Sequence, residues 1–234
     1  MGTMNTVLVS LLMDIGRWKS GASPRPMDFY QSSLRRVREA GVEVTVFGNA
    51  EGADQFFSFS DLVSLLPAGV FDQLESIRCR THGGGIQGES SWYAAITHAK
   101  MCLLERVFGQ NPLVDAAVWL DSGLAGHGLV SPENLKNINP PTGFHVARAH
   151  AGSGWHVPGI EPHVTFPGRH VCGGLFGCRR SSFLPVILAY RRELVMWLER
   201  GVAPLEEDIF TLLEPTGVFD VHEGFGNLST ALKP

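Results

Sequence analysis

An unbroken run of apolar residues, TVLVSLLM at residues 6–13, has the length of one β-strand. A run without alternation is typical of a strand covered on both faces, and such strands belong to parallel sheets with helices on either side. A membrane span takes about 18–20 apolar residues, and no segment of the chain reaches that length. The run therefore predicts an α/β fold.

Helical and strand patterns alternate along the rest of the chain. After Pro26, apolar residues follow helical spacing as far as Gly41, and VEVTVFG at 42–48 reads as the next strand, so the two strands and the helix form a βαβ unit. Further helices are predicted at about 60–74 with an interruption at Pro67 and Gly69, at 90–108, at about 182–200 and at about 204–214, and further strands at 116–121, 144–150 and 170–177.

Composition excludes several classes of protein. With 44% hydrophobic and 18% charged residues, the 234-residue chain is expected to fold around one core. A net charge of -4 gives no general attraction for a polyanion, and only the short basic clusters Arg35, Arg36 and Arg38, and Arg179 and Arg180, keep nucleic acid as a secondary hypothesis. The four cysteines form no CxxC pair, which favours reduced thiols in a cytoplasmic protein.

The stretch AAVWLDSGLAGH, residues 116–127, is the first candidate site because an apolar strand ends on Asp121 and small residues follow. An ionised carboxylate in apolar surroundings costs several kcal/mol unless a partner pairs with it. Nucleotide-sugar enzymes place such a carboxylate beside a metal ion bound to a diphosphate, usually as Asp-x-Asp. Here Gly123 stands at the third position. The simpler alternative is an Asp that begins a turn.

Lys100 and an acidic triplet are the next candidates. Lys100 lies on the helix that leads into the strand before Asp121, from where its ammonium can reach a phosphate; the alternative is an exposed helix lysine. Glu206, Glu207 and Asp208 open a predicted helix, where the helix dipole alone favours acids. The functional alternative is that one of them faces an acceptor hydroxyl as general base.

Glycine and histidine supply weaker candidates. Gly173 and Gly174 interrupt a strand pattern, which suits the close approach of a sugar. His222 follows a short apolar strand and is either a late metal ligand or a structural histidine. A zinc site is a further alternative, but the spacing of its candidate ligands matches no tetrahedral zinc motif. These candidates are His145, His150, His156, His163, His170, Cys172 and Cys178.

Five motifs carry a resemblance to a known family: LLMDIGRW, SWYAAITHAKMCLLERVFGQNP, AVWLDSGLAGH, CGGLFGCRRSSF and EEDIFTLLEPTGVFDVH. They occur in the order seen in the HtrL/YibB-like (WlaTC-type) bacterial glycosyltransferases, which the chain resembles over residues 7–222. That group is similar to the wider GT-A nucleotide-sugar transferases. The resemblance implies a GT-A-like (Rossmann-related) α/β fold, with a mixed, mostly parallel sheet flanked by helices, in one domain over residues 1–234.

The resemblance also implies roles for individual residues. It implies a donor site of Asp14, Gly16, Arg17, Lys100, Asp121, Ser122, Gly173 and Gly174. It implies catalytic or acceptor-binding carboxylates among Asp121, Glu206, Glu207 and Asp208. It further implies Mn²⁺ or Mg²⁺ held by Asp121 and His222, although Gly123 removes one expected ligand of that ion.

The sequence thus predicts a hexosyltransferase-type enzyme that moves a sugar from a nucleoside diphosphate, with a UDP-sugar favoured, to a hydroxyl of a glycan or another acceptor. Two alternatives stay open. One is a catalytically degenerate protein that only binds nucleotides or sugars. The other is a metal-dependent hydrolase of nucleotide sugars.

Overall fold

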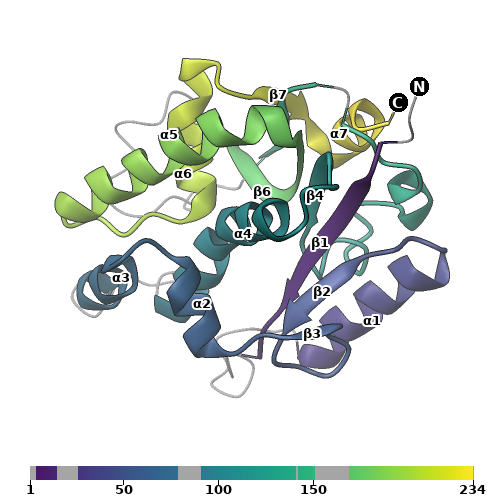
Figure 1. Ribbon diagram of the computed structural model, residues 1–234, viewed down its shortest axis with the longest axis horizontal. Helices are drawn as coiled ribbons and strands as arrows, with labels where there is room; N and C mark the ends of the chain where they lie inside the picture. Colours follow the sequence, from purple (N-terminus) through teal and green to yellow (C-terminus); the bar gives the residue numbers. More distant parts are fainter. Residues whose placement is uncertain (1–3, 15–25, 79–90, 141, 151–168, 234) are drawn as a thin grey trace.

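The fold is built on one seven-stranded sheet, seen in a computed structural model that describes residues 4–14, 26–78, 91–140, 142–150 and 169–233 (Figure 1). The strand order is β3-β2-β1-β4-β6-β5-β7. The strands are β1 Thr6–Leu12, β2 Thr45–Gly48, β3 Gln55–Phe56, β4 Ala116–Leu120, β5 Phe144–His150, β6 Arg169–Arg179 and β7 Asp220–Glu223. Only β6 runs against its neighbours β4 and β5, while the other four pairings are parallel, so the sheet is mixed and mostly parallel.

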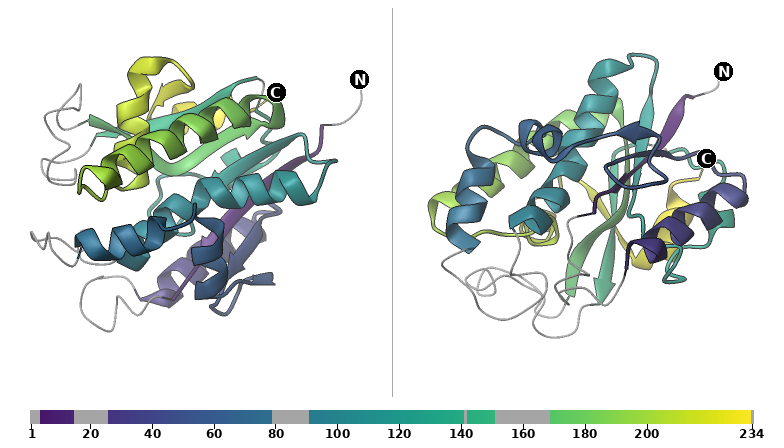
Figure 2. Two further views of the ribbon diagram at one scale, coloured as in Figure 1. Left: turned by 60° about the vertical axis from the view of Figure 1, so that its left-hand side comes forward. Right: turned by 90° about the horizontal axis from the view of Figure 1, so that it is seen from below.

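Helices cover both faces of the sheet (Figures 1 and 2). The α-helices are α1 Met27–Glu39, α2 Phe59–Leu65, α3 Val70–Arg78, α4 Ser91–Gln110, α5 Arg180–Glu199, α6 Glu206–Leu213 and α7 Gly224–Ala231, and the short 3₁₀ turns are η1 Pro132–Leu135 and η3 Glu214–Thr216. Helices α1 and α7 lie on one face, and α2 to α6 lie on the other. None of the helices in the described segments combines the length and the apolar character that crossing a bilayer requires.

Each face of the sheet has its own hydrophobic core. The larger core lies under α2 to α6, and its centre is aromatic. The ring of Phe210 on α6 lies 5.6 Å from that of Phe176 on β6, 5.5 Å from that of Tyr190 on α5 and 5.8 Å from that of Phe219. The smaller core joins α1, η1 and α7 to the other face. Because both faces are covered, the central strands read as continuous apolar runs.

Most elements lie where the sequence predicts them, and the α/β fold class is confirmed. The strand predicted at 6–13 is β1, and the helix predicted from Pro26 to Gly41 is α1. The interrupted pattern at 60–74 is two helices, α2 and α3, separated around Pro67 and Gly69 because proline and glycine end helical runs. Strand β3 and helix α7 were not predicted, since the first has two residues and the second contains two glycines.

The order in which the chain adds strands to the sheet changes direction at β1. The chain passes from β1 to β2 on one side, whereas β4 pairs with β1 on the other side. Open α/β sheets bind ligands in the crevice outside the carboxyl ends of strands at such a switch point. Asp14 follows the end of β1 and Asp121 follows the end of β4, so the topology places both acids at the edge where a ligand is expected.

Replacing Phe210 with alanine is expected to lower the free energy of unfolding by about 3–5 kcal/mol, because it leaves a cavity among packed rings. Phe210 is fully buried, whereas Phe56 on the edge strand is 80% exposed. Phe56→Ala, the same chemical change at the surface, should alter stability by less than about 0.5 kcal/mol. Urea denaturation of both variants measures the difference, and equal losses would contradict this account of the core.

Candidate functional site

A buried lysine lies at the centre of the candidate site. Lys100 on α4 is 5% exposed, and its ammonium meets three groups from three other parts of the chain. Nζ lies 3.0 Å from Oδ1 of Asp121 and donates to the carbonyl oxygen of Gly173 at 3.2 Å, and it also bonds Oε1 of Glu206. An ammonium has three hydrogens, so the side chain is saturated by protein oxygens. The structure thus makes Lys100 an internal counter-ion.

A bulge in β6 supplies backbone oxygens to the same cluster. Val146 on β5 pairs with Phe176, but the next residue, Ala147, pairs with Cys172, so residues 173–175 bulge out of the β5 ladder. The carbonyl of Gly174 accepts the backbone N–H of Asp121 at 2.7 Å, and the carbonyl of Gly173 accepts from Lys100. Bulges often adjoin active sites because they redirect backbone groups.

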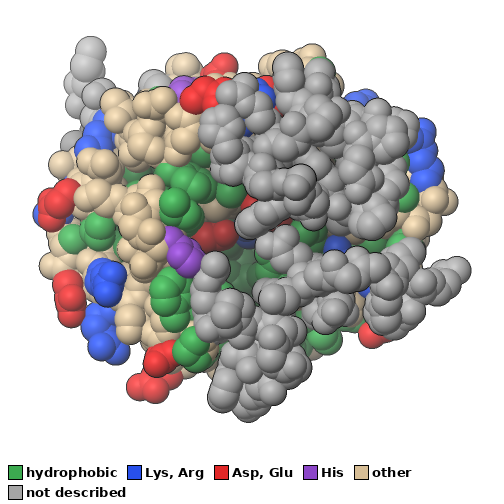
Figure 3. Space-filling view, turned by 180° about the vertical axis from the view of Figure 1, so that it is seen from behind, with side chains coloured by type: hydrophobic (Ala, Val, Ile, Leu, Met, Phe, Trp, Pro, Cys, Tyr) green, Lys and Arg blue, Asp and Glu red, His purple; other side chains and the backbone are tan. Residues whose placement is uncertain are grey.

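Asp121 is held in place and still reaches solvent. The indole N–H of Trp119 donates to its Oδ1 at 2.7 Å, and Lys100 bonds both carboxylate oxygens. The side chain of Asp121 is 37% exposed, whereas that of Lys100 is 6% exposed. The carboxylate is therefore the outer member of the pair. Seen from behind, acidic side chains lie among hydrophobic ones near the middle of one face (Figure 3).

The charges in the cluster shift one another's pKa. Burial raises the pKa of the Glu206 carboxyl to about 7, and the neighbouring acids add to this rise while Lys100 opposes it. Burial likewise raises the pKa of Asp121 against the opposing effects of Lys100 and Trp119. Burial alone would lower the pKa of Lys100, but the charges of Asp121 and Glu206 raise it well above its usual value. Lys100 therefore stays charged at neutral pH.

The acidic triplet divides into three environments. Glu206 is 2% exposed and pairs with Lys100. Asp208 is also 2% exposed, and its Oδ2 accepts the backbone N–H of Leu205 at 2.8 Å, which caps the start of α6. Glu207 is half-buried, and its Oε1 accepts from the Cys172 thiol at 3.2 Å. Of the three acids, Glu207 is the one that the fold leaves partly exposed beside Asp121.

Two buried side chains fix the segment that precedes α6. His98 lies two residues before Lys100 on α4; its Nε2 lies 2.9 Å from the carbonyl oxygen of Pro204, and its Nδ1 lies 2.7 Å from the Tyr190 hydroxyl. Burial lowers the pKa of His98 to about 3, so the ring is neutral, donates to the Pro204 carbonyl and accepts from Tyr190. Arg78 donates to the carbonyl of Ala203 at 3.1 Å. Helix α4 thus holds both Glu206 and the backbone just before it.

The glycines of the site face protein side chains. A Cβ built on Gly173 would lie 2.6 Å from Oε1 of Glu206, so a side chain at 173 would displace this acid. A Cβ on Gly174 would lie 3.3 Å from Leu124. The close approach that the sequence predicts is present, but the group that approaches Gly173 is the chain's own carboxylate rather than an open sugar site.

Gly123, the departure from Asp-x-Asp, is covered by α1. A Cβ at position 123 would lie 3.1 Å from Cε1 of Tyr30 and 3.5 Å from Cε1 of Phe29. The turn 121–127 therefore packs against the start of α1 through an aromatic ring. A side chain at position 123 would require the ring of Tyr30 to shift by a few tenths of an ångström.

His222 does not join the cluster. Trp119, Lys100 and Glu206 place Asp121 on the face covered by α4 and α6, whereas Val221 packs on that face and the next residue, His222, points to the other one. Nε2 of His222 lies 3.2 Å from Nδ1 of His145. Two strands, β6 and β5, also separate β4 from β7, a distance of about 14 Å between the outer backbones. Asp121 and His222 therefore cannot share one ion.

The other described side chains that can bind metals do not form a metal site either. Within the described ranges, no group of three His, Cys, Asp or Glu side chains is arranged to hold a metal ion. Hard divalent cations take about six oxygen ligands, with carboxylates prominent among them. Asp121 is already engaged by an ammonium and an indole, and Glu206 by the same ammonium. The side chains that the structure describes therefore do not fit the implied Mn²⁺ or Mg²⁺.

The other predicted donor-site residues are placed as follows. Asp14 is half-buried after β1, and its backbone N–H donates to Oδ1 of Asn49 at 2.8 Å. Ser122 is half-buried in the turn after Asp121. Gly16 and Arg17 lie outside the described residues.

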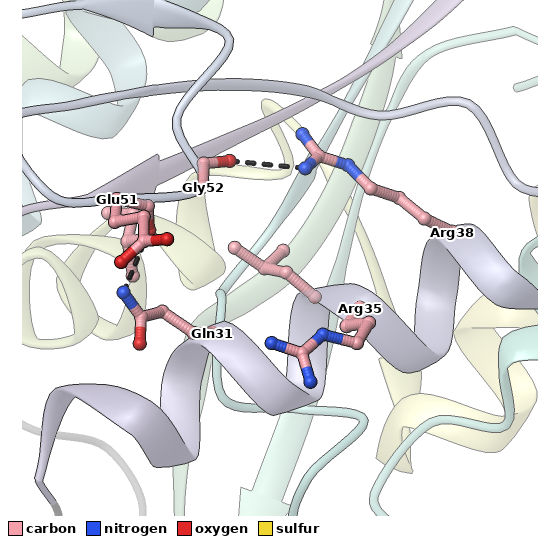
Figure 4. Close-up of a pocket in the computed structure, with 7 residues that line it drawn as sticks. Gln31, Arg35, Arg38, Glu51 and Gly52 are labelled. Carbon is pink, nitrogen blue, oxygen red and sulfur yellow. Dashed lines mark hydrogen bonds between the residues drawn. The ribbon is translucent and has the colours of Figure 1, made fainter.

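A small cavity of about 190 Å³ lies between α1 and the turn after β2 (Figure 4). Gln31 and Arg38 on α1 donate to the carbonyls of Glu51 and Gly52, at 2.9 and 3.1 Å, across this cavity. Arg38 also pairs with Asp54 at 2.6 Å. The cavity is lined by Leu12, Gln31, Leu34, Arg35, Arg38, Glu51 and Gly52.

Several basic side chains proposed for phosphate contacts are engaged within the chain. Arg180 donates to the carbonyls of Val114, Phe108 and Asn111, and Arg179 donates to that of Pro140 at 2.8 Å. These guanidinium groups join the ends of α4, β4 and α5. Their main contacts are therefore structural, which weakens the nucleic-acid hypothesis further.

The sequence analysis assigned no role to two members of the site that periodicity can find. Trp119 lies two residues before Asp121, on the same face of the strand by the period of two. Tyr93 lies seven residues before Lys100, on the same side of α4; burial raises the pKa of its hydroxyl, and the nearby charges of Glu206 and Glu207 raise it further. Nothing in the sequence indicates that Pro204 and His98 are in contact.

The solved structures that are similar to this chain include two transferases. One is a glycosyltransferase involved in the glycosylation of the major capsid of PBCV-1, with 9% identity and a TM-score of 0.41 over 93% of this chain and 81% of that chain. The other is mouse xyloside xylosyltransferase 1 in its apo form, with 10% identity and a TM-score of 0.46 over 94% of this chain and 85% of that chain. No protein-family model and no curated protein matches the sequence. Neither similar structure identifies the HtrL/YibB-like group.

The raised pKa of Glu206 predicts a loss of stability as the pH rises. Its pKa is about 7 in the folded protein, against an ordinary 4.5, so between these values the folded state binds a proton that the unfolded chain has released. The free energy of unfolding therefore falls between about pH 4.5 and 7, by up to about 1.4 kcal/mol per pH unit from this group.

Urea unfolding at several pH values, for the wild type and for Glu206→Gln, measures this contribution. The glutamine variant cannot titrate at this position, so the wild type should lose stability relative to it as the pH increases. Parallel profiles for the two proteins would show that Glu206 does not carry the raised pKa.

Proposed function

We propose that this protein is a glycosyltransferase that moves a sugar from a nucleoside diphosphate to a hydroxyl acceptor, with a UDP-sugar as the favoured donor. The observation that supports it most is the buried Lys100 ammonium, which pairs with Asp121 at the carboxyl end of β4 and with Glu206, the residue before the half-buried Glu207. This end adjoins the switch point of the sheet, where α/β proteins bind ligands. The motif order of the sequence supports the same function.

In this proposal the two exposed acids have different roles. Asp121 is fixed by Trp119 and Lys100 and faces the donor, so it orients a donor group without moving. Glu207 faces the acceptor and takes the proton of its hydroxyl as general base. The acceptor oxygen forms a bond to the anomeric carbon, and the electron pair of the broken bond leaves with the diphosphate.

Lys100, Glu206 and Asp208 are positioning residues in this scheme. Lys100 has no free hydrogen for a phosphate, and its contacts tie the strand that carries Asp121 to the helix that carries Glu207. Asp208 caps that helix. A hexosyl donor and an acceptor with a free hydroxyl are the expected substrates.

A hydrolase of nucleotide sugars is the second candidate function. A water molecule in place of the acceptor hydroxyl needs the same base, and the half-buried Glu207 suits that role equally. Release of nucleoside diphosphate that is stimulated by an acceptor indicates a transferase. Release at the same rate without acceptor indicates a hydrolase.

Asp121→Ala and Glu207→Gln are each expected to lower the rate of acceptor-stimulated release of nucleoside diphosphate by about 10²–10⁴-fold, as loss of a positioned acid or base does. Asp121→Ala leaves Lys100 paired with Glu206, so folding should survive. Asp115→Ala is the matched control, because Asp115 precedes the same strand at its opposite end, where its carboxylate accepts the backbone N–H of Asn5. Wild-type rates in Asp121→Ala would contradict the proposal.

A further inference from the structure

An aromatic ring lies against the position where a second acid would follow β4. Gly123 is buried, and a Cβ there would meet Cε1 and Cδ1 of Tyr30 at 3.1 and 3.3 Å. The ring belongs to α1, whose packing on the turn 121–127 also includes Phe29 against His127, with ring centroids 4.9 Å apart. The turn is therefore built around a single carboxylate, that of Asp121.

That carboxylate already has a cation. Lys100 lies 3.0 Å from its Oδ1, and a divalent ion bound to either oxygen would lie within about 5 Å of the ammonium, given metal–oxygen distances of about 2.1 Å. Two cations at that separation repel each other.

One acceptor position of Asp121 remains for a ligand. A carboxylate offers about four lone-pair sites. Trp119 and Lys100 use Oδ1, and Lys100 also reaches Oδ2 at 3.2 Å. The side chain is 37% exposed, so its free acceptor capacity faces outward. A neutral hydroxyl group matches this capacity, whereas a phosphate oxygen, which is itself an acceptor, does not.

We propose that the Asp121 site holds no divalent cation, because Lys100 acts as its built-in counter-ion. In the proposed function, the remaining acceptor position of Asp121 then takes a hydroxyl of the donor, either on its ribose or on its sugar. The inference rests on the proposed function for the identity of the ligand. Its statement about the cation depends only on Asp121, Lys100 and Gly123.

A titration with Mn²⁺, followed by electron paramagnetic resonance, tests the cation directly. The wild type, Asp121→Ala and Asp115→Ala are compared without nucleotide and with UDP at a concentration that saturates each of the three proteins. We expect the same Mn²⁺ occupancy in the three proteins under each condition. A bound Mn²⁺ that is lost in Asp121→Ala but kept in Asp115→Ala overturns the inference, whether or not the protein proves to be a transferase.

Isothermal titration with UDP and with UDP-glucose tests the contact between Asp121 and a donor hydroxyl. Each titration is done in about 5 mM EDTA and again in about 1 mM Mn²⁺. We expect affinities that agree within about twofold between the two conditions, and a loss of about tenfold or more in Asp121→Ala. A loss for both ligands identifies a ribose hydroxyl, and a loss for UDP-glucose alone identifies a sugar hydroxyl. Affinity that requires Mn²⁺, or that Asp121→Ala leaves unchanged, overturns the inference.

The two proposals fail in different ways. If neither ligand binds, nor the GDP and GDP-glucose used in a parallel titration, the nucleotide-sugar function fails and the hydroxyl contact fails with it. The cation part is then decided by the Mn²⁺ titration alone. If nucleotides bind only through Mn²⁺, the function stands and the inference about Asp121 is wrong.

Discussion

The contact between the Lys100 ammonium and two carboxylates is the interaction on which the candidate site depends. It joins α4 to the end of β4 and the start of α6, and through the Gly173 carbonyl it also joins β6. Removing one partner of a buried ion pair is costly, about 3–5 kcal/mol, because it leaves a charge without compensation. The cluster therefore fixes the relative position of four elements as well as the charge at the strand end.

Bulge and glycine positions make room for this cluster. The β6 bulge turns the carbonyls of Gly173 and Gly174 toward Lys100 and the backbone of Asp121. Absence of a side chain at Gly173 gives Glu206 its place. In the same way, absence of a side chain at Gly123 gives the ring of Tyr30 its place. These glycines suggest flexibility in the sequence, but in the fold they leave space that the side chains of other residues fill.

The three consecutive acids Glu206, Glu207 and Asp208 have three different structural environments. Helix geometry turns Glu206 toward Lys100, lets Asp208 reach the backbone of Leu205, and leaves Glu207 beside the Cys172 thiol. The helix dipole favours all three acids equally, so it does not distinguish them. Only the surroundings do, through burial and through the partner that each carboxylate meets.

The sequence by itself determined the α/β class and the approximate positions of the main helices, because these follow from periodicity. It also predicted that Asp121 needs a partner, because an unpaired charge beside an apolar strand is costly. The period of two along a strand also places Trp119 on the same face as Asp121. Tertiary structure alone decided that Lys100 is saturated by protein oxygens, that His222 lies on the opposite face with His145, and that Tyr30 covers Gly123. These contacts join residues far apart in the chain, and no local pattern encodes which distant side chains meet when the sheet assembles.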